Sequence, residues 1–276
     1  MSKLIGTAPN QVPTNADLGS AAYIDSNTIL KSSGITTDGL VSWINASYTG
    51  GEPTDISGNG NDFTLINDPP YVSEPVGYWQ LNGTNQGLER QGGAALFDSA
   101  KQNYTMEIWL ADDTDYDVDN TARNWHPFGI GQQPADGGSD TTWYMHNNYG
   151  NYMYFQYEST DGSTYTPANY PRVGPKPGPG KWFYVALVIQ GSNRILHLYL
   201  NGEMVWSGRP ASDSDTAAMR YEATHDIQLG KDPRYNTGES GRHLKGKIAE
   251  YRAYDRPLLP DEIKSNYLAS KAKYGK

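Results

Sequence analysis

Residues 195–208, ILHLYLNGEMVWSG, decide the fold of this chain. Leucine recurs at positions 196, 198 and 200, and an alternation with a period of two is typical of a strand with one apolar face. Asn201 and Gly202 follow, and this pair is the strongest short signal for a two-residue hairpin turn. The stretch therefore predicts two long antiparallel strands joined by a tight turn.

Short β-prone runs separated by turn residues extend this pattern on both sides of the hairpin. Tyr104, Met106, Ile108 and Leu110 repeat the alternation. The other runs are LVSWINA, DFTLI, GYWQLNG, TWYMHN, YMYFQYES, KWFYVALVIQ, IQLGK and KGKIAEYRAYD. Because no helices are interleaved with them, the spacing predicts an antiparallel β-sandwich.

The two ends of the chain differ from the middle. The C-terminal run LLPDEIKSNYLASKAKY reads as a helix, with Pro260 in its first turn and Asp261 and Glu262 at the positive end of its dipole. Residues 1–38 are rich in small and polar residues and predict an arm with one short helix, followed by a linker. We therefore expect an arm and linker over 1–38 and a folded domain over 39–276.

The composition excludes several classes of protein. The chain has 276 residues, no cysteine and a net charge of −9. It has no Lys/Arg-rich run, which argues against nucleic-acid binding. No apolar run approaches the roughly 20 residues that a membrane span needs, and residues 1–12 lack the apolar core of a signal peptide. We expect a protein that is made in a cytoplasm and carries no disulfides.

The runs occur together in an order that resembles a known family. LVSWINA, DISGNGNDFTL, WQLNGTNQGLE, YTMEIWL, the 195–208 hairpin, IQLGK and LKGKIAEYRAYDRPLLPDEIKSNY resemble the concanavalin A-like, laminin G-like jelly-roll family over about residues 39–270. The resemblance implies an all-β jelly roll, an antiparallel β-sandwich with a short N-terminal arm and a C-terminal helix. This fold carries lectins, adhesion modules and glycosidases alike, so it does not select a function.

The arm has a resemblance of its own. IGTAPNQVPTNADLGSAAYID is similar to a short N-terminal motif of bacteriophage tail-fibre and other virion structural proteins. The resemblance implies that residues 1–38 attach the protein to other virion proteins, becoming ordered when they dock. The alternative is a disordered tail. Fibre-associated modules are often trimers, so a homo-oligomer is expected by analogy.

The loop DISGNGND is the sharpest local cluster of oxygen ligands. Asp55, Ser57 and Asn59 alternate as in the first half of an EF-hand loop, but Ile66 stands where that loop needs a bidentate Glu. The family resemblance implies a structural Ca²⁺ held by Asp55, Asn59 and Asn61 together with Glu250. The alternative is a Gly/Asn turn held by side-chain hydrogen bonds to the backbone. The acidic run DDTDYDVDN (112–120) is a second, weaker candidate for a metal and otherwise a solvated loop.

Aromatic residues concentrate between positions 125 and 170, among many amides and acids. Flat aromatic rings beside amide and carboxylate groups suit the apolar faces and hydroxyl edges of sugars. The predicted glycan-binding residues are Trp125, Trp143, Tyr144, His146, Asn147 and Tyr149. We expect Trp125, Trp143 and Tyr149 to be exposed near loops, whereas Trp43, Trp109 and Trp182 belong to the core. The same residues would also suit a contact between subunits.

Catalytic signals are absent from the sequence. Glycosidases need two carboxylates flanking the scissile bond, and Glu107 and Asp112 stand five positions apart on opposite faces of a strand. The five histidines match no metal or triad signature. We therefore expect no enzyme. The two resemblances together imply a bacteriophage virion structural protein, in a tail fibre, another tail part or a capsid decoration, that displays a lectin-like domain for binding host-surface glycans. The alternatives are a virion joint without glycan binding and a carbohydrate-binding module or glycosidase-related protein.

Overall fold

The computed structural model describes most of the predicted domain. The described residues are 33–97, 103–114, 125–132, 140–147, 152–158, 164–165, 172–174, 176–191, 195–208, 222–233 and 243–276. Residues 1–32, with the short helix expected near Asn15, lie outside them. Among the described residues, no helix is long and apolar enough to cross a membrane.

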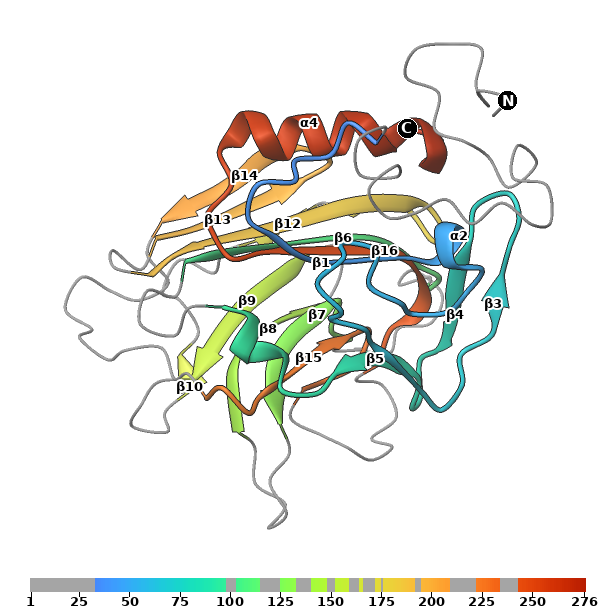
Figure 1. Cartoon of the computed structure of the whole chain (residues 1–276), viewed down its shortest axis with the longest axis horizontal. Coiled ribbons are helices and arrows are strands. Elements are labelled where there is room, and N and C mark those ends of the chain that lie inside the picture. Colours follow the sequence, from blue (N-terminus) through green and yellow to red (C-terminus); the bar gives the residue numbers. More distant parts are fainter. Residues whose placement is uncertain are drawn as a thin grey trace.

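The strands form two antiparallel sheets, which confirms the predicted sandwich (Figure 1). Sheet A runs in the order β14-β13-β12-β6-β16-β4-β3, and β1 pairs with β16. Its strands are β1 (Leu40–Asn45), β3 (Tyr71–Val72), β4 (Tyr78–Asn82), β6 (Tyr104–Asp112), β12 (Trp182–Gln190), β13 (Ile195–Leu200), β14 (Glu203–Gly208) and β16 (Lys245–Tyr254).

Sheet B lies against sheet A and runs in the order β10-β9-β8-β7-β15-β5-β2, with β11 paired to β9. Its strands are β2 (Thr64–Ile66), β5 (Gly87–Arg90), β7 (Phe128–Gln132), β8 (Asp140–Asn147), β9 (Met153–Glu158), β10 (Thr164–Tyr165), β11 (Arg172–Val173) and β15 (Asp226–Leu229). Strands close in sequence often lie in different sheets, as expected for a jelly roll.

The predicted hairpin is present at one edge of sheet A. β13 and β14 pair antiparallel, and the turn residues Asn201 and Gly202 have φ values of 51° and 77°. Positive φ at both turn residues matches the right-handed twist of the flanking strands. The alternating leucines Leu196 and Leu198 are buried in the core between the sheets.

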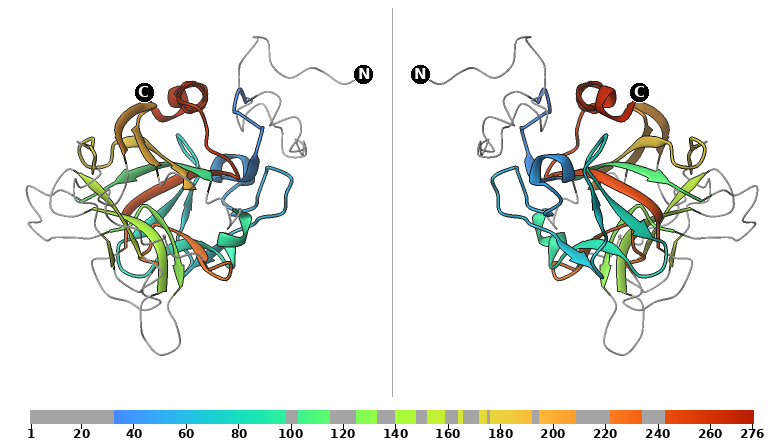
Figure 2. Two further views of the ribbon diagram at one scale, coloured as in Figure 1. Left: turned by 90° about the vertical axis from the view of Figure 1, so that its left-hand side faces the viewer. Right: turned by 90° about the vertical axis from the view of Figure 1, so that its right-hand side faces the viewer.

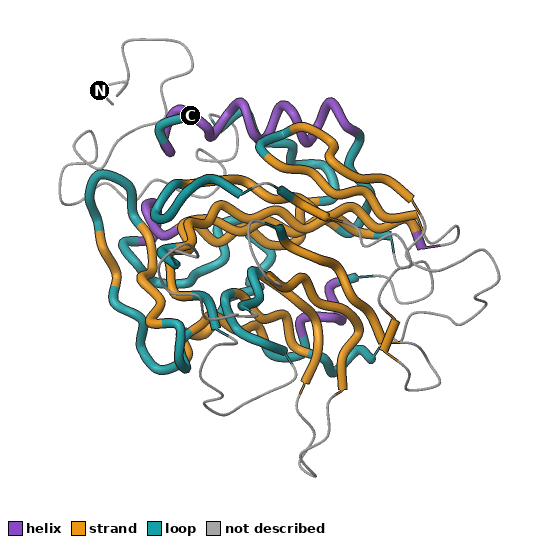
Figure 3. Tube along the Cα trace, turned by 180° about the vertical axis from the view of Figure 1, so that it is seen from behind, coloured by secondary structure: helices purple, strands orange, loops and turns teal. Residues whose placement is uncertain are grey.

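The central strand β6 is buried on both faces, because sheet A is covered on both sides. Met106, Ile108 and Leu110 face sheet B, whereas Trp109 faces the opposite way. The C-terminal helix α4 (Pro260–Lys271) and the 3-10 turn η3 (Ala272–Tyr274) lie over this second face. Figures 2 and 3 show the resulting three layers, with α4 on the outer side of sheet A.

The helix begins as its sequence predicts. Pro260 occupies the first turn with Asp261 and Glu262, and the Glu262 carboxylate accepts a hydrogen bond from the Leu259 backbone N–H at 2.8 Å. Negative charge there is favoured by the helix dipole. Ile263 and Tyr274 anchor α4 and η3 in the second apolar cluster with Trp43, Trp109 and other residues of sheet A.

The end of the predicted linker belongs to the packed domain. Ile35 is buried in the cluster beneath α4, and the Thr36 backbone N–H donates to Asn266 Oδ1 at 2.8 Å. Asp38 pairs with Arg256 at 2.9 Å. Residues 33–38 thus lie along the helix side of sheet A, and residues 1–32 join the domain on that side.

Candidate functional site

The outer face of sheet B, which points away from sheet A, carries a row of polar side chains. Strand register places Glu89, Gln228, Gly129, Tyr144 and Gln156 side by side across β5, β15, β7, β8 and β9. Residues next to them in sequence fill the core between the sheets: Leu88, Ile227, Leu229, Phe128, Ile130, Trp143, Met145 and Phe155. Because successive strand residues point to opposite faces, the polar row faces outward.

Solvent reaches this face at its β8–β9 end. Tyr154 and Gln156 are half-buried and Tyr152 is 36% exposed. The Tyr144 hydroxyl donates to Gln156 Oε1 at 2.6 Å. Tyrosine rings beside a fixed amide offer a sugar an apolar platform and a hydrogen-bonding partner.

Buried polar groups support the other end of the row. Glu89 Oε2 accepts hydrogen bonds from Gln228 Nε2 at 3.1 Å and from Lys231 Nζ at 3.4 Å. Within the described part of the chain, Gln228 Oε1 has no hydrogen-bond partner. Gly129 lets Tyr144 and Pro233 approach the backbone of β7 closely in the middle of the row. A Cβ at this position would lie 2.9 Å from Tyr144 Cβ and 3.0 Å from Pro233 Cγ.

The expected exposure of Trp125 and Trp143 is wrong. Both indoles are fully buried in the core between the sheets, and Tyr144 is 2% exposed. Trp143 lies in β8 at a position whose side chain points inward, where its Nε1 donates to the Tyr104 hydroxyl. Buried indoles cannot offer a ring face to a sugar, so these two tryptophans stabilise the sandwich.

A buried ion pair accounts for the position of Trp125. The Lys176 ammonium lies 4.7 Å from the ring centroid and pairs with Asp112 at 2.9 Å. Burial lowers the pKa of Lys176, and Asp112 opposes this shift. The Lys176 ammonium therefore packs over the Trp125 ring, and the Asp112 carboxylate at the end of β6 neutralises its charge.

The remaining predicted glycan residues are placed only in part. His146 and Asn147 lie in β8, where they pair with Tyr154 and Met153 of β9. Tyr149 lies outside the described residues. The expected core positions of Trp43 and Trp109 are confirmed, whereas Trp182 is only half-buried.

The predicted calcium loop holds its oxygens in hydrogen bonds. Asp55 Oδ1 accepts from the Trp43 and Ser57 backbone N–H groups at 2.8 and 2.9 Å. Asp55 Oδ2 accepts from the Ser57 hydroxyl at 2.8 Å and from the Asn61 N–H at 2.9 Å. The amide nitrogens of Asn59 and Asn61 donate to the carbonyls of residues 40 and 41.

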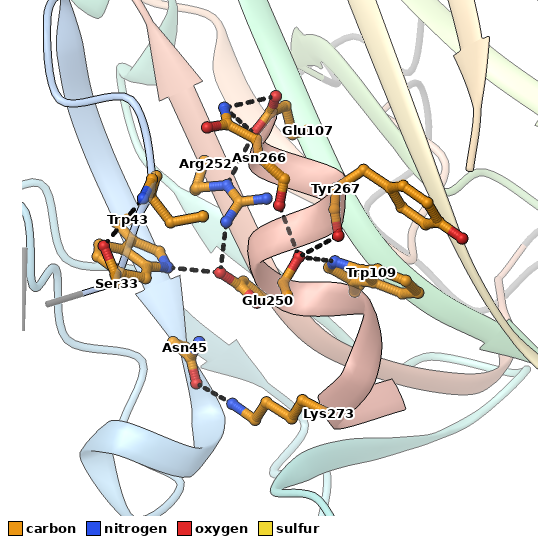
Figure 4. A network of polar contacts seen from close by, with 12 residues as sticks. Ser33, Trp43, Asn45, Glu107, Trp109, Glu250, Arg252, Asn266, Tyr267 and Lys273 are labelled. Atoms are coloured by element: carbon orange, nitrogen blue, oxygen red, sulfur yellow. Dashed lines mark hydrogen bonds and ion pairs between the residues drawn. The ribbon is translucent and has the colours of Figure 1, made fainter. Parts of the chain in front are cut away.

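Glu250 lies in a different cluster, the buried polar network beneath α4 (Figure 4). Its Oε1 accepts from Trp43 Nε1 and from the Arg252 guanidinium, both at 2.8 Å. Its Oε2 accepts from the Tyr274 hydroxyl at 2.9 Å. Trp43 thus contacts both Asp55 and Glu250, through its backbone and its indole.

This arrangement does not fit Ca²⁺ as it stands. The four contacts to Asp55 come from N–H and O–H donors, which suit a carboxylate rather than a cation. Calcium binding would require the amides of Asn59 and Asn61 to turn their oxygens inward. Among the described residues, no group of three or more His, Asp or Glu side chains could hold a metal.

The carboxylates weighed for catalysis are both engaged in ion pairs. Glu107 Oε2 binds the Arg252 guanidinium at 2.7 Å, and Asn266 Nδ2 donates to the same carboxylate at 3.0 Å. Burial by itself would lower the pKa of Arg252, but Glu250 and Glu107 raise it well above its usual value. The guanidinium therefore stays charged between two buried carboxylates.

The described carboxylates of the acidic run form ion pairs with lysines. Asp113 pairs with Lys247 at 3.4 Å, and Asp112 pairs with Lys176. Residues 115–120 of the run lie outside the described residues. Burial lowers the pKa of His197 on β13.

The alternation of polar and apolar residues in two strands indicates the polar row, but a search for dense aromatic residues does not detect it. In IQLGK, Gln228 stands between Ile227 and Leu229, and in GLER, Glu89 follows Leu88. A polar residue flanked by apolar ones in a strand marks an outward position. Aromatic density alone could not separate inward from outward rings.

Comparison with known families supports the fold. The family model described as the concanavalin A-like lectin/glucanases superfamily matches residues 82–264. No curated protein sequence matches the chain.

Three solved structures illustrate the likeness. The binding domain of botulinum neurotoxin serotype G has a TM-score of 0.61 and 14% identity, over 84% of this chain and 51% of that one. A sialidase of Trypanosoma rangeli, in complex with 2,3-difluorosialic acid, has a TM-score of 0.57 and 13% identity, over 86% and 34%. Domain 4 of AbnA, an extracellular arabinanase from Geobacillus stearothermophilus in complex with arabinotriose, has a TM-score of 0.56 and 16% identity, over 83% and 98%.

These identities show a shared fold. The chain spans about a third of the sialidase and about half of the neurotoxin binding domain, whereas it spans nearly the whole of the arabinanase domain.

Proposed function

This chain belongs to the concanavalin A-like lectin/glucanase superfamily, and we propose that it is a lectin-like protein that binds glycans on the outer face of sheet B. One observation carries the proposal: Tyr152, Tyr154 and Gln156 are accessible to solvent next to a hydrogen-bonded polar row. The likeness of this chain to an arabinanase domain solved with arabinotriose also supports the proposed saccharide binding. Binding without turnover is the proposed activity, because Glu107 is held by Arg252 and Asn266.

A glycan array tests this proposal with the full-length protein. The wild type is expected to retain at least one host-surface glycan, and Tyr154→Ala with Gln156→Ala to lose it. Met204→Ala is the matched control, because Met204 is 44% exposed on β14 of the other sheet. An array without any hit would reject glycan binding and favour the alternative of a structural joint. Release of reducing sugar that stops in Glu107→Gln would instead indicate an enzyme.

The second part of the proposal concerns location. We infer that residues 1–38 attach the protein to a bacteriophage particle, because residues 5–25 resemble N-terminal motifs of virion proteins. The described end of this segment lies on the helix side of sheet A, and sheet B lies on the opposite side of sheet A (Figure 1). Attachment through residues 1–32 would therefore leave the outer face of sheet B directed away from the particle.

Removal of residues 1–32 tests the attachment. The shortened protein is expected to melt as the full chain does, to bind the same glycans, and to be lost from purified particles. Particles that retain it would contradict the role of the arm. Light scattering of the full chain in the same experiment tests the expected trimer.

The family resemblance implies a structural Ca²⁺ at Asp55, Asn59, Asn61 and Glu250, whereas the contacts of these residues favour a hydrogen-bonded turn without a metal. Saturating Ca²⁺ would add about 2.7 kcal/mol to the free energy of unfolding at a hundred times its dissociation constant. Thermal melting with Ca²⁺ and with a chelator measures this difference. Equal melting temperatures would leave the loop as the hydrogen-bonded turn that its contacts describe.

A further inference from the structure

A second mixed aromatic and polar surface lies on the outer face of sheet A, beside the end of η3. Register places Gln80, Lys247, Ala111 and Trp182 in one row across β4, β16, β6 and β12. Residues adjacent to these in sequence face the core between the sheets: Trp79, Leu81, Ile248, Leu110 and Phe183. The row therefore points away from sheet B. We call Tyr78, Gln80, Asp113, Trp182 and Lys247 the sheet A patch.

Two half-buried rings form the apolar part of this patch. The centroids of Tyr78 and Trp182 lie 5.7 Å apart with planes at 68°, and Trp182 also packs 5.3 Å from Tyr274. Ala111 lies between Lys247 and Trp182 in this row, and its side chain is short and fully buried. Both rings are half-buried, so each is packed in part and reaches solvent in part.

Three polar groups are fixed beside the rings. Asp113 Oδ2 accepts from Gln80 Nε2 at 3.0 Å, and Asp113 Oδ1 lies 3.4 Å from Lys247 Nζ. The Lys247 ammonium lies 5.6 Å from the Tyr78 centroid. The side chains of Asp113 and Lys247 are 25% and 22% exposed.

A glycine leaves this ion pair accessible. Gly180 has a φ of +70°, and a Cβ there would lie 3.5 Å from Asp113 Oδ1 and 3.9 Å from Lys247 Nζ. Any larger side chain would lie over the pair. The loop before β12 therefore approaches the patch without covering its carboxylate and ammonium groups.

We propose that the sheet A patch is a second saccharide-binding site, which takes one uncharged pyranose unit of an oligosaccharide. The rings of Tyr78 and Trp182 contact the apolar face of the sugar, and Asp113, Gln80 and Lys247 bind adjacent hydroxyls. A carboxylate oxygen can accept two hydrogen bonds, so Asp113 can bind a hydroxyl while it keeps its present partner. Because Asp113 and Lys247 neutralise each other, no unpaired charge of the patch selects an acidic sugar. The proposal extends glycan binding to a second face and stands apart from the site on sheet B.

Titration calorimetry with cellohexaose, β-1,4-mannohexaose and maltohexaose tests the patch in the full-length protein that carries Tyr154→Ala and Gln156→Ala. At least one hexasaccharide is expected to bind this double variant. Adding Trp182→Ala or Asp113→Ala should weaken that binding by about tenfold or more. Asp113→Ala leaves both rings in place, so it tests the patch even where Trp182→Ala unfolds. Adding Met204→Ala instead is the control and should leave the affinity unchanged.

The outcomes separate the two sites. A double variant that binds none of the three sugars overturns the patch, whatever the wild type binds. Binding that survives Asp113→Ala at full strength also overturns it. Binding that is lost on adding Trp182→Ala or Asp113→Ala, and kept on adding Met204→Ala, supports the patch. This holds even if the site on sheet B proves wrong.

Discussion

Arg252 lies at the centre of the buried polar network beneath α4. Its fully buried guanidinium binds Glu107 at 2.7 Å and Glu250 at 2.8 Å. Removing one partner from a buried ion pair leaves an uncompensated charge, which costs about 3–5 kcal/mol. We predict that Arg252→Met lowers the free energy of unfolding by this amount, as measured by urea denaturation.

Arg256 supplies the matched control. It pairs with Asp38 and Glu262, but its side chain is 26% exposed. Arg256→Met is expected to cost less than about 1 kcal/mol, because water screens partly exposed pairs. Equal losses in the two variants would show that the buried network does not hold the fold.

His243 makes stability depend on pH. Burial and the nearby Lys231 lower its pKa from 6.5 to about 4, against the opposite effect of Asp232. The unfolded chain therefore binds a proton that the folded chain does not, and stability falls as pH decreases from 6.5 to 4. The largest loss from this group is about 3 kcal/mol.

Replacing this histidine should remove its share of the pH dependence. We predict that the free energy of unfolding of His243→Gln falls less between pH 7 and pH 4 than that of the wild type. Denaturation at a series of pH values measures the difference. Parallel curves for the two proteins would contradict the buried neutral state of His243.

At the scale of elements, the β13–β14 hairpin packs against α4 through its turn. Gly202 has a φ of +77°, and a Cβ there would lie 2.8 Å from the Tyr267 ring. Gly50 has a similar φ of +67°, but nothing lies within 4 Å of its Cβ position. Both sites carry backbone strain for alanine, about 1–2 kcal/mol, and only Gly202 adds a clash.

The two alanine variants therefore separate strain from packing. Gly202→Ala is expected to lose about 1–3 kcal/mol more than Gly50→Ala, because the extra methyl group must displace Tyr267. Thermal denaturation of the two variants measures the gap. If the gap is absent, the hairpin does not hold the helix at this point.

The same hairpin shows what a sequence predicts well. Alternation in β13, the Asn201-Gly202 turn and the Pro260 helix start are local signals, and all three are confirmed. The signal that failed was also local: Trp125 and Trp143 lie in a segment rich in Gly and Asn, yet both are core residues. Their burial depends on Lys176, Phe128 and other residues far along the chain or across strands, which composition does not report.

The candidate site was predicted only to the level of its strand. Tyr144 was named from sequence, and the structure places it in the polar row. Glu89 and Gln228 reach that row through pairings of β5, β15 and β7 that are distant in sequence. The order of strands in sheet B brings them into the same row as Tyr144.

At the scale of the molecule, sheet A is a shared middle layer. One of its faces packs on sheet B, and the other packs on α4 and residues 33–38 (Figure 1). Residues 33–38 and the outer face of sheet B therefore lie on opposite sides of this layer. Under the proposed function, the particle would hold the helix side of the protein while the outer face of sheet B contacts the host surface.

Hydrogen exchange of the full-length protein tests this account most directly, with and without the strongest glycan from the array. The proposed site predicts slower exchange in residues 152–158, which include β9, with little change in residues 33–38. Protection confined to residues 33–38 and α4, or no protection in β9, would contradict a glycan site on the outer face of sheet B.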